Sequence, residues 1–186
     1  MKNFVIGTVF AALALAATPA MAQSVTLEGR FADLQNNRDN ATEYRAQYDN
    51  SLAFLKYGVE LTTKQGENDG DIGSKIAVKA GVDLDGPLGF KVAPRAEVGY
   101  GLRTGDNFEF WGGSVALKRH VIGNVSAEAG YRHRQAFAGG NNFNEERLHG
   151  GLTLTLTEKT AINGTYYRTR GTTESDAVGV GVTFGF

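Results

Sequence analysis

Residues 175–186 read Ser-Asp-Ala-Val-Gly-Val-Gly-Val-Thr-Phe-Gly-Phe, and this stretch decides the fold. Its larger apolar side chains occupy every second position from Val178 to Phe186, and alanine, glycine and threonine stand at the positions between them. A helix would scatter these apolar residues around its circumference, whereas a strand places them all on one side. The stretch therefore predicts a β-strand with one apolar face and one face of small residues.

The same alternation recurs upstream, which predicts an all-β fold for most of the chain. Leu27 and Phe31 share one face of a predicted strand, and Glu28 and Arg30 share the other. The same period of two runs through residues 75–84, 90–103, 125–134 and 148–156. Charged residues interrupt every apolar run in this part of the chain, so no membrane-spanning helix is expected there.

The first 22 residues have a different character and predict a cleaved secretory signal peptide. Lys2 provides a positive start, residues 4–17 are apolar without a charge, and Ala20-Met21-Ala22 offers small residues for cleavage. The apolar run is shorter than the roughly 20 residues that a membrane-spanning helix needs. We therefore expect residues 23–186 to form one exported domain.

Composition narrows the possible partners. The formal net charge of −1 excludes a nucleic-acid partner held by bulk basicity, and a chain with no cysteine has no disulfide or thiolate metal site. The three histidines are far apart in sequence, so neither a metal nor another cofactor is expected. Asp69 and Asp71 have the spacing of a calcium loop, but the distal glutamate is missing and a solvated loop is the better interpretation.

Turn signals predict ten strands that alternate in direction. Short links stand at residues 85–87, 121–124 and 157–159, and the polar links at residues 36–40, 65–73, 136–145 and 171–174 are mostly longer. Bacterial barrels keep short turns and both termini on the periplasmic side, which requires one further short turn, and Asp49-Asn50-Ser51 supplies it. Eight strands is the alternative if two weak segments are loops. Phe108 and Phe110 are out of phase with Trp111, which a bulge near Trp111 would repair.

Alternation alone does not separate a soluble sandwich from a membrane barrel, but export and aromatic placement do. Phe90, Phe184 and Phe186 fall near predicted periplasmic strand ends, and Tyr100, Tyr131 and Tyr166 fall nearer the outer ends, as in the aromatic girdles of membrane barrels. With its signal peptide and its Phe-terminated last strand, the chain resembles the bacterial outer-membrane β-barrel superfamily. The resemblance implies a single antiparallel up-and-down barrel in the outer membrane, in contact with lipid and lipopolysaccharide. It also implies that Phe184 and Phe186 belong to the signal read by the β-barrel assembly machinery.

The predicted inward faces leave two functions open. A basic wall would face a wall of small or neutral groups that includes Gly179, Gly181 and Thr183. The residues of this predicted basic wall are Lys75, Lys79, Lys91, Arg95, Arg103, Lys118, Arg132 and Arg134. Lysines and arginines lining a pore favour anions, which predicts a small porin-like channel for small, preferably anionic solutes. Alternatively, the basic groups pair with inward glutamates and fill a structural or adhesive barrel that presents its loops.

An enzyme is the third possibility and is not expected. Some small outer-membrane barrels hydrolyse lipid or peptides at the outer rim, and His133 and His149 fall near predicted outer strand ends. Their sequence neighbours supply no nucleophile, so contact with lipopolysaccharide is the preferred interpretation. Arg168 and Arg170 share an outward face, where they could meet lipid phosphates.

Overall fold

The computed structural model describes residues 23–34, 40–66, 72–103, 106–137, 142–172 and 174–186, and alternating sequence becomes strand in nearly all of them. The strands are β1 (Ser24–Leu34), β2 (Ala41–Leu52), β3 (Leu55–Gly66), β4 (Ile72–Val82), β5 (Leu84–Asp85), β6 (Phe90–Arg103), β7 (Asp106–Ile122), β8 (Val125–Ala136), β9 (Asn144–Thr157), β10 (Thr160–Gly171) and β11 (Ser175–Gly185). A short 3-10 turn, η1 (Pro87–Gly89), precedes β6. Within the described residues, no helix is long and apolar enough to cross a membrane.

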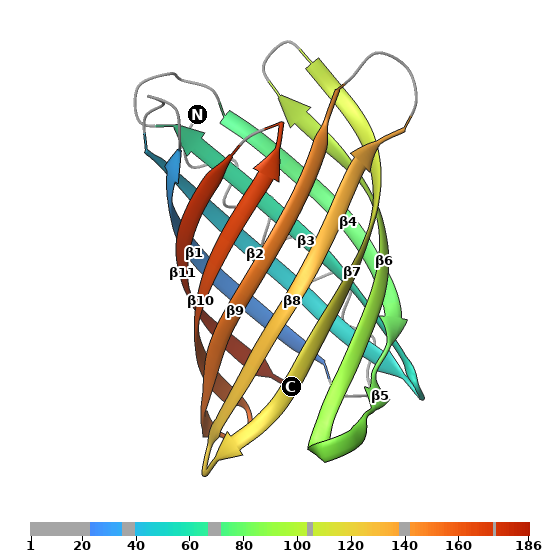
Figure 1. Ribbon diagram of the computed structural model, residues 1–186, viewed down its shortest axis with the longest axis vertical. Helices are drawn as coiled ribbons and strands as arrows, with labels where there is room; N and C mark the ends of the chain where they lie inside the picture. The colour runs from blue at the N-terminus through green and yellow to red at the C-terminus, as the bar shows by residue number, and fades with distance from the viewer. Residues whose placement is uncertain (1–22, 35–39, 67–71, 104–105, 138–141, 173) are drawn as a thin grey trace.

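The strands close into one antiparallel barrel with up-and-down connectivity (Figure 1). Neighbours in sequence pair with one another, β1 pairs with β11, and β4 pairs with β6. The short β5 continues β4 beyond an interruption at Asp83, and both pair with β6, so eleven strands make ten crossings. The prediction of ten strands is confirmed, and the eight-stranded alternative is wrong.

The short connections all lie at one end of the barrel, the lower end in Figure 1. They include two-residue turns at residues 53–54, 123–124 and 158–159, together with the connection through η1. The carboxyl-terminal ends of β1, β3, β6, β8 and β10 lie at the opposite end of the barrel. By the rule that bacterial barrels have short periplasmic turns, the lower end is the periplasmic end and the upper end is the outer end.

The predicted turn at Asp49-Asn50-Ser51 is wrong in position, although the extra hairpin exists. Strand β2 continues through these residues to Leu52, which pairs with Leu55 across a turn made by Ala53 and Phe54. Pairing with β3 holds these turn-favouring residues in an extended conformation. Tertiary context thus overrides their local preference for a turn. Phe54 stands in the turn and is 78% exposed, so it belongs to neither face of a strand.

The predicted bulge near Trp111 is also wrong. The pairing of β6 with β7 runs without a shift from Phe90 opposite Arg119 to Arg103 opposite Asp106. Phe110 is fully buried in the barrel interior, whereas its neighbour Trp111 is exposed on the outer surface. The strand therefore keeps its period of two and places aromatic rings on both faces.

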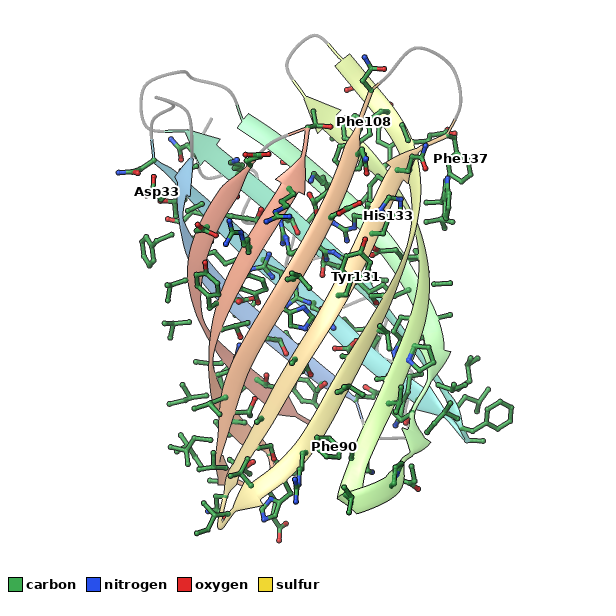
Figure 2. All side chains as sticks on the ribbon, viewed as in Figure 1. Asp33, Phe90, Phe108, Tyr131, His133 and Phe137 are labelled. Atoms are coloured by element: carbon green, nitrogen blue, oxygen red, sulfur yellow. The ribbon has the colours of Figure 1, made fainter. Side chains whose placement is uncertain are left out.

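The outer surface is apolar, as a membrane barrel requires. Large apolar side chains exposed on it include Val78, Val98, Leu117, Tyr131, Leu152, Ile162 and Val180. Figure 2 shows Phe90 toward the periplasmic end and Phe137 at the outer end. The inward faces of the strands carry the charged groups instead, and several of these groups are buried.

Candidate functional site

Twelve charged side chains from opposite walls meet inside the barrel, and we call them the ion-pair band. Its members are Glu28, Arg30, Glu43, Arg45, Glu60, Lys75, Lys79, Glu97, Arg132, Arg134, Glu145 and Arg147. Each of them occupies an inward position of its strand, and the residues on either side of it point outward. The band is the largest concentration of charge that the structure describes in the interior.

Glu60 is the centre of the ion-pair band. Its carboxylate accepts hydrogen bonds from Arg45 Nε at 2.8 Å and Lys79 Nζ at 2.5 Å. Across the lumen it also accepts from Arg132 Nη1 at 3.2 Å and Arg134 Nη2 at 2.8 Å. Glu60 and Arg134 are each only 2% exposed, so side chains fill the cross-section at this level.

Glu145 gathers a second set of cations. It accepts hydrogen bonds from Lys75 Nζ at 2.8 Å and from Arg132 Nη2 at 3.0 Å. Arg147 approaches it at 3.6 Å and Arg134 at 3.9 Å. Two carboxylates therefore hold most of the basic groups of the band, which satisfies the rule that buried charges are paired.

Strands β1 and β2 contribute a third part of the band. Arg30 pairs with Glu43 and, at 2.9 Å, with Glu28. Its guanidinium also lies 4.2 Å from the ring centre of Tyr167, whose hydroxyl donates to Glu28 at 2.6 Å. Arg45 links this part to Glu60, because it contacts Glu28 at 3.0 Å as well.

Aromatic rings stand beside the band near the outer end. Phe108, Phe110 and Phe143, which we call the aromatic cluster, have ring centres 4.6 to 6.2 Å apart. Phe110 lies 5.0 Å from the guanidinium of Arg134, and Phe143 lies 4.8 Å from Lys75 Nζ. The sequence pattern does not predict this cluster, because Phe108 and Phe110 share the inward face of β7 with small and polar residues, whereas Trp111 begins its apolar outward face.

On one side of the barrel, exposure of inward side chains increases toward the periplasmic end. Along β9, Glu145 and Arg147 are buried, His149 and Thr153 are partly exposed, and Thr157 is exposed. On β7 and β8, Lys118 and Glu128 form a partly exposed pair at 3.0 Å nearer the periplasmic end. Water therefore reaches the interior beside β7, β8 and β9 at the periplasmic end, whereas the charged side chains nearer the outer end are buried.

The residues of the predicted basic wall divide between these two regions. Lys75, Lys79, Arg132 and Arg134 belong to the ion-pair band. Nearer the periplasmic end, Arg95 pairs with Asp83, Lys118 with Glu128, and the more exposed Lys91 reaches Asp85 at 4.0 Å. The side chain of Arg103 lies outside the described residues, as do Asp69 and Asp71.

The small residues of β11 are not all beside open space. A Cβ atom at Gly179 would stand 2.3 Å from Glu28 Oε1, so this glycine makes room for the ion-pair band. Gly181 lies against Asn163, and Thr183 shares a hydrogen bond of 2.8 Å with Thr26. The outward face of the same strand exposes Phe184 and Phe186.

The two histidines named as rim candidates lie on different faces. His133 is on the outer surface beside Trp111, with ring centres 6.2 Å apart. His149 faces the interior, where its Nε2 lies 3.0 Å from Glu128 Oε1. The structure therefore does not bring them together as one rim site.

Comparison with solved structures identifies barrels of the same kind at low sequence identity. The β-domain of the Bordetella autotransporter BrkA superposes with a TM-score of 0.55 at 12% identity, covering 89% of this chain and 99% of that domain. The KdgM porin gives 0.53 at 14% identity, covering 88% and 99%. An outer-membrane channel from Pseudomonas putida F1 gives 0.58 at 9% identity, covering 91% and 97%.

No protein-family model matches the chain, and no curated protein matches it. These solved structures share the closed antiparallel barrel fold with this chain. The apolar outer surface of the barrel is what a location in the bacterial outer membrane requires. The fold of this chain is thus a closed antiparallel up-and-down barrel with ten crossings, similar to the fold of these solved outer-membrane proteins.

Proposed function

We propose that this protein is a narrow outer-membrane channel that passes small anions slowly through the ion-pair band. The observation that carries the proposal is the charge of the band, which contains seven cations and five carboxylates. The cations are Arg30, Arg45, Lys75, Lys79, Arg132, Arg134 and Arg147. A constriction with an excess of two positive charges attracts anions and repels cations.

The filled cross-section sets the expected conductance. Because Glu60 and Arg134 are buried against one another, an anion passes only when these ion pairs rearrange. Glu60 and Glu145 are tethered anions that occupy the path, so a mobile anion competes with them for the same cations. The porin and the channel among the structural neighbours support the porin-like interpretation, although the likeness extends only to the fold.

Planar-bilayer recording of the refolded barrel tests the proposal. We expect small discrete currents and, in a salt gradient, a reversal potential of the sign that anion preference gives. Arg132→Gln should reduce the anion preference, whereas Arg168→Gln on the outer surface should leave it unchanged. Currents equal to those of bare lipid, or a preference for cations, would reject the channel.

A second candidate is a non-conducting barrel that serves as a structural element or presents its loops. Burial of the aromatic cluster favours it, because Phe110 has no exposed surface beside a fully paired Arg134. This candidate predicts that the wild-type protein does not conduct and that Phe110→Ala together with Glu60→Ala produces measurable current. If the wild type conducts, the second candidate is rejected.

A further inference from the structure

The periplasmic ends of β2, β5 and β7, with the connections that follow β2 and β5, carry six large apolar side chains that are each more than half exposed. They are Leu52, Phe54, Leu84, Leu88, Val121 and Ile122, and we call them the apolar edge. Leu88 in η1 is 80% exposed, and Phe54 in the β2–β3 turn is 78% exposed. Exposed apolar groups in such number mark a surface that contacts a membrane or another protein.

The apolar edge runs along neighbouring hairpins at the periplasmic end of the barrel (Figure 1). Leu55, directly after the β2–β3 turn, stands opposite Val82 at the end of β4, which β5 continues. Phe90, directly after η1, stands opposite Arg119, two residues before Val121 on β7. The three connections are therefore adjacent around the rim, and their apolar side chains form one surface.

This surface continues the lipid-facing side of the barrel. Leu84 of β5 stands opposite Val92 on the outward face of β6, and Val121 takes the outward position after Arg119 on β7. Arg119 is exposed, and its guanidinium lies 4.9 Å from the ring centre of Phe90. A long basic side chain beside an aromatic ring is typical of the level at which a protein meets lipid headgroups. The apolar edge lies at this level and beyond it toward the periplasm.

Leu88 occupies a backbone conformation that suits glycine. Its φ of 59° and ψ of 26° lie in the left-handed region, where the Cβ atom of an L-residue is unfavourable. Its side chain gains little from packing against the described part of the chain, because it is 80% exposed. An observed backbone outlier of this kind points to a functional constraint. An apolar contact outside the chain would account for a leucine at this position.

We propose that the apolar edge docks into the periplasmic leaflet of the outer membrane, at the boundary between phospholipid headgroups and acyl chains. Apolar side chains bury at this boundary, and Arg119 reaches the lipid phosphates beside them. The β9–β10 turn, Glu158-Lys159, is exposed and charged, so it stays in water. Lipid therefore holds the periplasmic end of the barrel on one side. This inference goes beyond the proposed channel and does not depend on conduction.

Tryptophan fluorescence of the refolded barrel in lipid vesicles tests the docking. Trp111 is the single tryptophan of the chain, so Trp111→Phe gives a background without tryptophan emission. Phe54→Trp and Leu88→Trp are then introduced one at a time, and Glu158→Trp in the charged turn is the matched control. The vesicles contain phosphatidylcholine with or without bromine on the acyl chains near the carbonyl groups, and acrylamide serves as the quencher in water.

We expect brominated lipid to quench the Phe54→Trp and Leu88→Trp variants at least about twofold more strongly than the Glu158→Trp variant, because their indole rings lie at the acyl boundary. Acrylamide should show the opposite order. If Leu88→Trp does not fold, Ile122→Trp probes the edge beside the β7–β8 turn, and the same result is expected of it.

The proposal is overturned if acrylamide quenches the edge variants as strongly as the Glu158→Trp variant, since the edge would then lie in water or await a protein partner. Shielding from both quenchers would place the edge against another copy of the chain, which also overturns it. Lipid quenching at only one of the two connections would show that the edge is not one docking surface.

Discussion

Glu60 shows how much of the interior depends on one carboxylate. Replacing it with glutamine leaves four hydrogen-bonded cations around a neutral side chain. Removal of one partner from a buried ion pair costs roughly 3 to 5 kcal/mol, so we expect Glu60→Gln to lower the free energy of unfolding by about that amount. Urea unfolding in lipid vesicles measures the loss.

Glu158→Gln is the control for that measurement, because Glu158 lies in the exposed turn between β9 and β10. Its effect should stay within about 0.5 kcal/mol. Equal stability of Glu60→Gln and the wild type would show that the ion pairs are not coupled to folding.

Two glycines on neighbouring strands provide a test of packing. A Cβ atom at Gly179 would meet Glu28 Oε1 at 2.3 Å, whereas one at Gly164 would meet nothing within 4 Å. We expect Gly179→Ala to destabilise the barrel by about 1 to 3 kcal/mol through overpacking. Gly164→Ala should be neutral or stabilising, since glycine in a strand is itself unfavourable. A comparison of urea midpoints checks the difference, and equal midpoints would contradict the described packing around Glu28.

At the scale of the element, two periplasmic hairpins carry the same backbone geometry with different residues. The first residue of each two-residue turn has a positive φ of 53°, and it is Ala53 in one hairpin and Gly123 in the other. An L-residue in this conformation costs about 1 to 2 kcal/mol, whereas glycine adopts it freely.

Ala53→Gly should therefore stabilise the β2–β3 hairpin, and Gly123→Ala should destabilise the β7–β8 hairpin, each by up to about 1 kcal/mol. Thermal unfolding of the two variants beside the wild type measures both signs. Shifts in the same direction would contradict the shared turn geometry.

At the scale of the whole molecule, the barrel is closed by the pairing of its first and last strands. Eleven residue pairs join β1 to β11, from Ser24 opposite Gly185 to Leu34 opposite Ser175. Deleting residues 175–186 leaves β1 and β10 with open edges, which a bilayer does not tolerate. We expect the deletion to abolish the compact, heat-modifiable form on gel electrophoresis after refolding into vesicles.

Phe184→Ala with Phe186→Ala keeps the strand and removes only the exposed rings. If these rings form the assembly signal, as the sequence predicts, this variant should refold in pure lipid but assemble slowly in cells. A deletion variant that still forms the compact band would contradict closure through β11.

The sequence predicts the barrel well because alternation is a local property that each strand carries by itself. It misplaces the β2–β3 turn because Asp49-Asn50-Ser51 favours a turn locally, while pairing with β3 holds it extended. It does not predict the partners inside the lumen, since Glu60 and Arg134 are 74 residues apart. The two-residue period predicts which charged side chains face inward. It does not predict which of them pair, because that depends on which strands face one another across the closed barrel.

The uneven exposure of the interior also has an electrical consequence. Beside β7, β8 and β9 at the periplasmic end, where Lys118 and Thr157 are exposed, water reaches the interior, and less voltage falls there than across a packed layer. A transmembrane potential then falls more steeply across the packed level that contains Glu60 and Arg134, which are each 2% exposed. Moving one elementary charge across a potential of 100 mV changes its free energy by about 2.3 kcal/mol. In the proposed channel an applied field would thus act most strongly on the ion-pair band, and currents of opposite sign should differ in size.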